Sequence, residues 1–547
     1  MKPLLVGLLA IPALSNAAPA VTPPGAGDLL QQIQPQVAPA PSSPDTGLRM
    51  EQEGGEKLPP SKPFMVKRIQ ITGNALFDAA TLHALVAGSE GRELTLSQLD
   101  ELAAKITDYY HSHGYPLARA IVPAQTIKDG VVTIEVIEAK YGRIRLDNRS
   151  RVDSLLLEDT LPSLMSGAPI DQESMDHALL LLSDVPGVAV DATLSPGEAV
   201  GTSDLNVVTD ATPFVSGSGQ LDNYGNKYTG RNRLGANLFV SNPLHHGDVL
   251  SFSALTSGSG MNYGRVGYDT LLNGYGTHAG ASYSALHYIL GGSLANLNGH
   301  GTADVGSAWI RQTMARSRDF NVYGQMQYDH LKLDDQIDAS NIQTKRHLDN
   351  VTGTLSGDSR NVGGVNTWSL AVTTGNVGFD NSSAQLADAA TANTQGAFSK
   401  WNLNASRLQG LGGDTSLYAA LSGQWSNANL DPSQQMVAGG PYTVRAYDMG
   451  ALSGDEGYLG TVELRHNLNQ SWQAIAFWDS EHIVVNQNTW VAGVNSATLT
   501  GAGVGLNWMG RDSWNVRTYV AARIGAPSVL VAASSSSRVW VQVGKGF

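Results

Sequence analysis

The most informative segment of the chain reads Gly439-Gly440-Pro441-Tyr442-Thr443-Val444-Arg445-Ala446-Tyr447. It is a glycine-rich loop with one arginine among small and aromatic residues. A second segment, Ala476-Phe477-Trp478-Asp479, follows further along the chain. Phe477 and Asp479 are two residues apart, so in a β-strand both side chains point to the same face. We therefore expect Arg445, on a loop folded inward, to form a charge pair with Asp479 on the inner face of a strand.

Residues 214–547, which surround this pair, alternate apolar residues with small or polar ones between turns rich in Gly, Asn, Asp and Ser. In one such segment Val504, Leu506 and Trp508 alternate with small or polar neighbours. Small and polar residues on the second face suit a water-filled lumen better than a dry core. These 334 residues, divided among 16 strands, allow about 21 residues per strand and connection, enough for transmembrane strands of roughly 9–11 residues.

The last strand alternates Val539, Val541 and Val543 and closes on the terminal Phe547. A C-terminal aromatic residue after an alternating strand is typical of the membrane-targeting signal of bacterial outer-membrane barrels. A soluble β-sandwich would also alternate, but the polar inner faces favour a membrane barrel. We therefore predict a mainly β fold, a transmembrane β-barrel of about 16 antiparallel strands over residues 214–547.

The composition excludes several functions. The net charge of −13, with charged residues at only 15% of the chain, argues against a nucleic-acid partner. The absence of cysteine rules out disulfides, cysteine-ligated zinc and a thiol nucleophile. The segment Asp479-Ser480-Glu481-His482 has no zinc-type spacing, and in a strand His482 faces away from both acids. We therefore predict no metal site, no cofactor and no catalytic residue.

The N-terminal region reads as a secretory signal followed by a linker. Lys2, the apolar run from Leu4 to Leu14 and the small residues after it predict a signal peptide over residues 1–17. Ten of the 23 prolines fall in residues 18–63, which predicts a linker without a packed core.

A short amphipathic helix is expected within the linker, at about residues 27–37. Asp28 can cap it, and Leu29, Leu30 and Ile33 form its apolar face. Because a helix this short is marginal without packing, two readings stay open. It is either a fraying turn in a disordered tail or a movable helix on a long tether.

Residues 64–139 and 140–213 each read as a compact α/β module. Both follow the order strand, helix, helix, strand, strand, so the unit repeats at a period of about 75 residues. Thr95 and Gln98 form a capping box at the start of the second helix of the first module. An exposed sheet edge in each module could accept an extended peptide, or the modules could be structural spacers.

With these features together, the chain resembles the outer-membrane transporters of bacterial two-partner secretion, the TpsB family. This family belongs to the superfamily of POTRA-plus-barrel translocases and insertases. Ile69-x-Ile71-x-Gly73-Asn74-x-x-Phe77 is similar to the opening of a POTRA domain. The run from Gly439 through Glu463-Leu464-Arg465 resembles the family's sixth extracellular loop and the strand that follows it. Phe477-x-Asp479 resembles the inward strand motif that the loop arginine contacts. The matching residues are Gly439, Gly440, Val444, Arg445, Tyr447, Gly454, Asp455, Phe477 and Asp479.

The resemblance implies two POTRA domains in the periplasm, a 16-strand barrel in the outer membrane and an N-terminal helix that plugs the pore. It also implies that the POTRA domains bind the N-terminal secretion domain of a secreted partner protein. Other expected partners are outer-membrane lipid and the barrel assembly machinery for insertion, and the chain is expected to be a monomer. The family commonly has glycine where this chain has Ala446, so either the backbone there is ordinary or the loop tip has a different shape.

The resemblance predicts a pore that exports a large exoprotein, an adhesin, cytolysin or contact-dependent toxin, without ATP. One alternative is an insertase that helps other barrels enter the membrane. Another is an outer-membrane barrel enzyme, a lipase or a protease, which would need a clustered nucleophile and base that the sequence does not supply.

Overall fold

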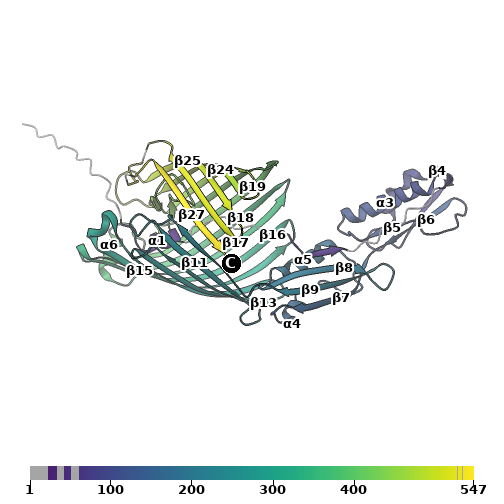
Figure 1. Ribbon diagram of the computed structural model, residues 1–547, viewed down its shortest axis with the longest axis horizontal. Helices are drawn as coiled ribbons and strands as arrows, with labels where there is room; N and C mark the ends of the chain where they lie inside the picture. The colour runs from purple at the N-terminus through teal and green to yellow at the C-terminus, as the bar shows by residue number, and fades with distance from the viewer. Residues whose placement is uncertain (1–22, 34–41, 51–60, 527, 533) are drawn as a thin grey trace, which may run out of the picture.

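The computed structural model describes residues 23–33, 42–50, 61–526, 528–532 and 534–547. They form a β-barrel with two α/β modules in a row at one mouth (Figure 1). The second module, residues 140–213, lies next to the barrel, and the first, residues 64–139, lies at the far end. The expected signal peptide lies outside the described residues. None of the helices in these ranges is long and apolar enough to cross a membrane.

Sixteen antiparallel strands close the barrel, because β10 pairs with β27 as well as with β11, and this confirms the predicted fold class. Each strand pairs with the next along the chain, except that β20 pairs with β23 across a long loop. The strands are β10 (Val215–Asp222), β11 (Arg233–Ser241), β12 (Val249–Thr256), β13 (Met261–Asn273), β14 (Thr277–Ile289), β15 (Gly299–Arg316), β16 (Phe320–Ile337), β17 (Ile342–Asn361), β18 (Gly364–Phe379), β19 (Gly396–Gly412), β20 (Thr415–Ser426), β23 (Glu456–Asn467), β24 (Trp472–Val484), β25 (Ser496–Met509), β26 (Trp514–Arg523) and β27 (Ser537–Gly546). The helix α6 (Ser382–Ala389), between β18 and β19, lies at the mouth away from the modules (Figure 1). The short η2 (Gly292–Leu297) and η3 (Asp338–Ser340) lie in the connections from β14 to β15 and from β16 to β17.

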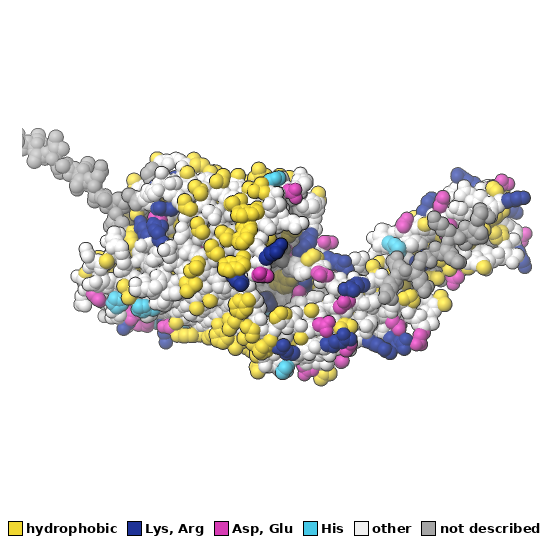
Figure 2. All heavy atoms as spheres, viewed as in Figure 1, with side chains coloured by type: hydrophobic (Ala, Val, Ile, Leu, Met, Phe, Trp, Pro, Cys, Tyr) yellow, Lys and Arg dark blue, Asp and Glu magenta, His cyan; other side chains and the backbone are white. Residues whose placement is uncertain are grey.

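The outside of the barrel is apolar over a band that runs across the strands (Figure 2). The two-residue period of a strand explains the band, since alternate side chains point outward. On β27, Val539 and Val541 are exposed while Trp540 between them is buried. An apolar outer band of this kind suits contact with lipid acyl chains.

The first module has a three-stranded sheet in the order β3 (Arg68–Thr72), β6 (Val131–Ile137), β5 (Arg119–Ile121). Two helices cover it. Asp78 caps the first by accepting from the Thr81 amide, and Thr95 and Gln98 form the predicted capping box of the second. The helices are α2 (Ala79–Ala84) and α3 (Leu96–Ser112), with the short η1 (Ala87–Ser89) and a small ladder of β2 (Phe64–Val66) and β4 (Arg92–Leu94) beside them.

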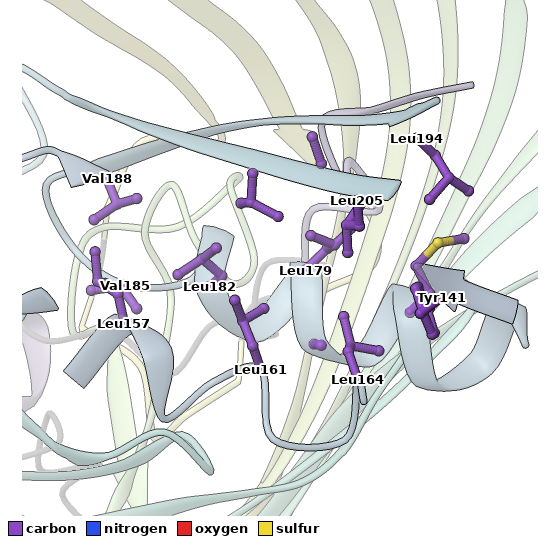
Figure 3. Close-up of a cluster of buried hydrophobic side chains, with 14 of the residues drawn as sticks. Tyr141, Leu157, Leu161, Leu164, Leu179, Leu182, Val185, Val188, Leu194 and Leu205 are labelled. Atoms are coloured by element: carbon purple, nitrogen blue, oxygen red, sulfur yellow. The ribbon is translucent and has the colours of Figure 1, made fainter. Parts of the chain in front are cut away.

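The second module repeats this plan and packs directly on the barrel. Its sheet has β9 (Thr202–Ala211) between β7 (Lys140–Arg149) and β8 (Val188–Pro196), covered by α4 (Ser154–Glu158) and α5 (Gln172–Ser183). Figure 3 shows the apolar side chains of α4 and α5 gathered against the sheet. Leu271 at the end of barrel strand β13 belongs to the same buried cluster, so this module and the barrel share a core.

Two elements of the modules are short. Strand β5 covers only Arg119–Ile121, and helix α4 covers only Ser154–Glu158. One sheet edge of the second module is covered, because a linker strand, β1 (Leu48–Met50), pairs in parallel with β8. At the opposite edge β7 pairs only with β9 among the strands of the described residues, so that edge is open.

Candidate functional site

The loop between β20 and β23 enters the barrel and occupies its lumen. Two short strands, β21 (Met436–Ala438) and β22 (Leu452–Gly454), pair to form its stem. Gly439 and Gly440 turn the chain at φ of +89° and +118°, a region that side chains with a Cβ rarely enter. Beyond this turn Val444 and Tyr447 are buried, so the loop tip packs against the barrel wall.

Arg445 at the loop tip binds β24 through a bidentate ion pair. Its Nε and Nη2 donate to the two carboxylate oxygens of Asp479 at 2.9 and 2.7 Å. The Arg445 amide also donates to Asp479, at 3.2 Å. Only 4% of the arginine side chain and none of the aspartate side chain is exposed, so both charges are removed from water and depend on each other.

Arg445 has a second carboxylate partner, which sequence reasoning placed in the motif but did not assign to the pair. Its Nη1 donates to Glu463 of β23 at 2.6 Å, and Arg465 donates to the other side of the same carboxylate. The guanidinium also stacks on Phe477, with its central carbon 3.5 Å from the ring centroid. Trp540 of β27 donates to the Arg445 carbonyl at 2.7 Å, so three strands hold this residue.

Ala446 occupies an ordinary backbone conformation, since it is absent from the non-glycine residues with positive φ. Its methyl group faces Gly501 of β25, and a Cβ at Gly501 would overlap that methyl group. Of the two possibilities left open by the sequence, the structure has the ordinary backbone. A glycine on the facing strand makes room for the alanine side chain.

Asp455 fastens the base of the loop. One carboxylate oxygen accepts from the Leu430 amide and the Gln435 side chain, and the other accepts from the Gln487 amide. Its neighbour Gly454 lies against the Val484 carbonyl, where a side chain would not fit. Asp455 therefore joins both ends of the loop to the turn after β24.

A second anchor of the loop tip was not predicted. Asp448 pairs with Arg231 at 2.8 Å and with Arg538 of β27 at 2.7 Å. Sequence could not reveal these pairs, because the arginines lie some two hundred residues before and ninety residues after Asp448 and carry no motif. Together with Arg445, they hold both sides of the tip.

The helix α1 (Ala26–Ile33) also lies inside the barrel, against β14, β15 and β16 and the loop. Leu29 and Leu30 are buried and Ile33 is partly buried in one apolar cluster with strand residues. The prediction that Asp28 caps the helix is wrong: the helix begins two residues earlier, and Asp28 in its first turn accepts from the Gly25 amide at 3.0 Å. Residues 34–37 of the expected helix lie outside the described residues.

A buried chain of charges joins α1, the barrel wall and the loop. The Ala26 amide donates to Asp335 of β16 at 2.7 Å, and Asp335 accepts from Arg346 of β17 at 2.7 Å. Arg346 also donates to Asp431 in the loop, next to η4 (Pro432–Gln434). Arg346 is thus a cation shared by the helix seat and the loop.

Asp28 lies beside this chain of charges. Burial raises the pKa of Asp28 to about 6, the Gly25 amide opposes that rise, and the nearby Asp335 adds to it. The seated helix therefore holds a proton on Asp28 at pH values where an exposed aspartate has lost it.

The C-terminal residues face outward and complete the closure of the barrel. Val539, Val541 and Phe547 are exposed on the outer surface, and Val543 is half-buried. Phe547 exchanges two backbone hydrogen bonds with Gly217 of β10, at 3.0 and 3.1 Å. On β24, Asp479 and Glu481 are buried on the inner side, while His482 bonds Thr498 on the other face.

An apolar outer band, a lumen filled by a loop and a helix, and α/β modules at one mouth define an outer-membrane transporter. Residues 201–508 match the protein family described as "Haemolysin secretion/activation protein ShlB/FhaC/HecB". Residues 64–139 match the family described as "POTRA domain, ShlB-type". The chain belongs to the ShlB/FhaC/HecB family. Members of this family are outer-membrane transporters of two-partner secretion, and their POTRA domains lie in the periplasm.

Among its relatives is the heme/hemopexin transporter protein HuxB of Haemophilus influenzae strain Rd, 30% identical over 471 residues that cover 84% of this chain and 83% of HuxB. The outer membrane transporter CdiB of Escherichia coli is 24% identical over 493 residues, covering 84% and 82%. The solved structure of CdiB from Escherichia coli has a TM-score of 0.70 at 21% identity, covering 96% of this chain and all of that one. BamA from Haemophilus ducreyi lacking POTRA domains 1–3 has a TM-score of 0.53 at 12% identity, covering 88% of this chain and all of that shortened chain, and shares the fold.

Proposed function

We propose that this chain is a gated pore that exports one large exoprotein from the periplasm to the cell surface. The observation that supports it best is the lumen, which α1 and the inward loop fill and which shared charges hold closed. A passive pore for small solutes would not need both a helix and a loop bound inside its lumen. The proposed parts are the plug and linker over residues 18–63, POTRA domains over 64–139 and 140–213, and a monomeric barrel over 214–547.

In this proposal the N-terminal secretion domain of the partner docks on the POTRA domains and then threads the barrel. Net movement comes from binding, release of α1 and folding of the partner outside, because the periplasm supplies no ATP. Arg445 and Asp479 keep the loop on the wall while the helix leaves. Arg346 and Arg445 in the lumen each pair with two carboxylates, which fits a positioning role.

The nature of the partner is a separate proposal. An adhesin, a cytolysin and a contact-dependent toxin are the candidates that the family suggests. The relatives at 30% identity are named for heme and hemopexin, so an exoprotein concerned with heme or hemopexin is a fourth candidate.

Deleting the gene tests the proposal. We expect the loss of one large protein from the cell surface and medium, while other outer-membrane proteins keep their normal amounts, and restoration by the gene in trans. Loss of many barrels from the outer membrane would instead favour an insertase. An unchanged surface and secreted proteome would contradict export.

A further inference from the structure

The sheet edges of the two POTRA domains differ in occupancy. In the described part of the chain, β5 of the first domain pairs only with β6, so its outer edge is open. The matching strand of the second domain, β8, pairs with β9 on one side and with linker strand β1 on the other. An extended segment of the chain itself thus covers the second edge.

The fit of the linker to this edge is specific. Leu48 packs against the core of the second POTRA domain, and Arg49 lies 3.3 Å from Asp191 of β8. Gly47 precedes them at φ +63°, and its carbonyl accepts from the Ala192 amide at 2.9 Å. A Cβ on Gly47 would overlap the Val190 carbonyl, so only glycine suits this position.

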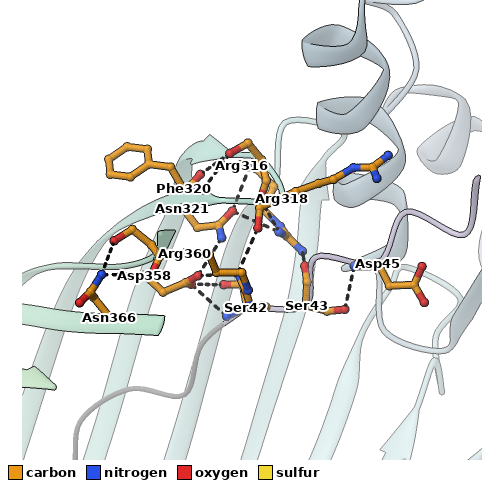
Figure 4. Close-up of polar contacts among 12 residues, drawn as sticks. Ser42, Ser43, Asp45, Arg316, Arg318, Phe320, Asn321, Asp358, Arg360 and Asn366 are labelled. Atoms are coloured by element: carbon orange, nitrogen blue, oxygen red, sulfur yellow. Dashed lines mark hydrogen bonds and ion pairs between the residues drawn. The ribbon is translucent and has the colours of Figure 1, made fainter. Parts of the chain in front are cut away.

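The residues just before this strand are fastened to the barrel mouth (Figure 4). The Ser42 amide and hydroxyl donate to Asp358 of β17 at 2.9 and 2.7 Å, and Arg360 donates to the Ser42 carbonyl. Arg316 of β15 donates to the Ser43 carbonyl at 2.9 Å. Asp358 and Arg316 are 2% and 3% exposed, so the linker meets a buried polar site.

The same arginine connects the linker to the second POTRA domain. Arg316 forms a two-pronged ion pair with Asp184, which directly follows α5, at 2.7 and 2.8 Å. Arg318 in the adjoining turn pairs with Asp176 of α5 at 2.6 Å and with Thr46 of the linker at 3.3 Å. Displacing the linker therefore removes contacts from the barrel mouth and from the domain at once.

We propose that residues 42–50 are an internal competitor that covers the docking edge of the second POTRA domain, and that an extended segment of the exported partner displaces it. The occupant of β8 is a parallel strand with an apolar residue at the Leu48 position, because that side chain enters the domain core. Only eight residues separate Ile33 of α1 from Ser42, about 30 Å when fully extended. Docking of the partner thus frees the tether of the plug helix. This inference rests on the proposed export function.

A peptide of the chain's own sequence Ser42–Met50 is the probe for the edge, since it needs no knowledge of the partner. In the full-length wild-type protein the tethered linker is present at an effective concentration near millimolar, so a micromolar peptide competes poorly. Gly47→Ala in the protein should loosen the linker and raise peptide binding at least ~10-fold. Gly88→Ala is the matched control, because a Cβ there meets nothing within 4 Å. Equal binding by wild type and Gly47→Ala would overturn the proposal.

A disulfide tests the consequence for export, and the absence of native cysteine makes it unambiguous. Arg49→Cys with Thr193→Cys places two thiols at paired positions of β1 and β8. We expect export of the protein lost on gene deletion to stop and to return with a reductant. The control is Ala189→Cys with Asp210→Cys, at paired positions of β8 and β9. This disulfide cross-links the domain without involving the linker, so the variant should export normally. Normal export by the cross-linked β1–β8 variant would overturn the inference, whereas failure of the wild type to export any protein would overturn the proposed function.

Discussion

Arg445 is held by carboxylates from two strands, by an aromatic face and by an indole that caps its carbonyl. A buried cation with this many partners fixes the loop tip in one position. Removing the side chain leaves Asp479 buried without its cation and leaves Glu463 with Arg465 alone, which is costly.

Arg445→Ala should impair export while the barrel stays in the membrane. Loss of one member of a buried ion pair destabilises by about 3 kcal/mol, and that loss falls on the loop rather than on the strand ladder. Export assays and heat-modifiable gel migration measure the two effects. The control is Arg265→Ala, which removes an exposed arginine of β13. It should leave both export and gel migration unchanged. Full export by Arg445→Ala would refute the role assigned to the pair.

The contact between Ala446 and Gly501 gives a second residue-scale prediction. Gly501→Ala places two methyl groups in the same space, so we expect the loop tip to shift and export to fall. Ala446→Gly in the same chain should restore export, because it removes the opposing methyl group. A double mutant no better than Gly501→Ala would show that the two positions do not compete for space.

The sequence supports the pairing of Arg445 with Asp479 because both residues stand in a recognisable pattern with fixed spacing. It does not supply Asp448 with its two arginines, nor the glycine that faces Ala446. Those contacts join strands far apart in the chain, and closure of the barrel alone brings them together.

At the scale of elements, α1 is a two-turn helix that could not persist alone in water. Burial of Leu29 and Leu30 and the charges on Asp335 and Arg346 stabilise it. The sequence predicts the apolar face of the helix. Its start at Ala26 depends on Asp335, which accepts a hydrogen bond from the Ala26 amide. Strand β1 is equally hidden from pattern analysis, because three residues show no alternation and its partner is more than a hundred residues away.

Arg346→Ala should loosen both elements that fill the lumen. The substitution leaves Asp335 and Asp431 without their shared cation, so helix and loop each lose a buried contact. In planar lipid bilayers we expect more frequent and longer openings than for the wild type. Arg407→Ala on β19, which pairs with neutral side chains, is the control. Identical opening statistics for Arg346→Ala and wild type would contradict a shared anchor.

The raised pKa of Asp28 predicts that the helix seat depends on pH. The seated state has a pKa of about 6 against the ordinary 3.8 of a released helix, so the seated state binds more protons between these values. Seating is therefore favoured below pH 4 and weakens as the pH rises through 6. Bilayer openings should be more frequent at pH 7 than at pH 5, and Asp28→Asn should abolish that difference. An unchanged pH dependence in Asp28→Asn would assign the effect to other groups.

At the scale of the whole molecule, the second α/β module, the barrel mouth and the linker form one junction. Leu271 of the barrel lies in the core of the domain, and Arg316 joins the domain to the linker. The repeat of two α/β modules and the sixteen-strand closure are predictable, since both arise from periodic patterns. The junction is not, because its residues come from separate elements that only the folded chain places side by side.

The central claim is that the barrel is an export pore closed by its own helix and loop. Single-channel recording in planar lipid bilayers, with and without residues 26–33, tests it most directly. The account predicts that the shortened protein conducts more current and stays open longer, because the lumen loses one of its two obstructions. Equal conductance for the two proteins would contradict it.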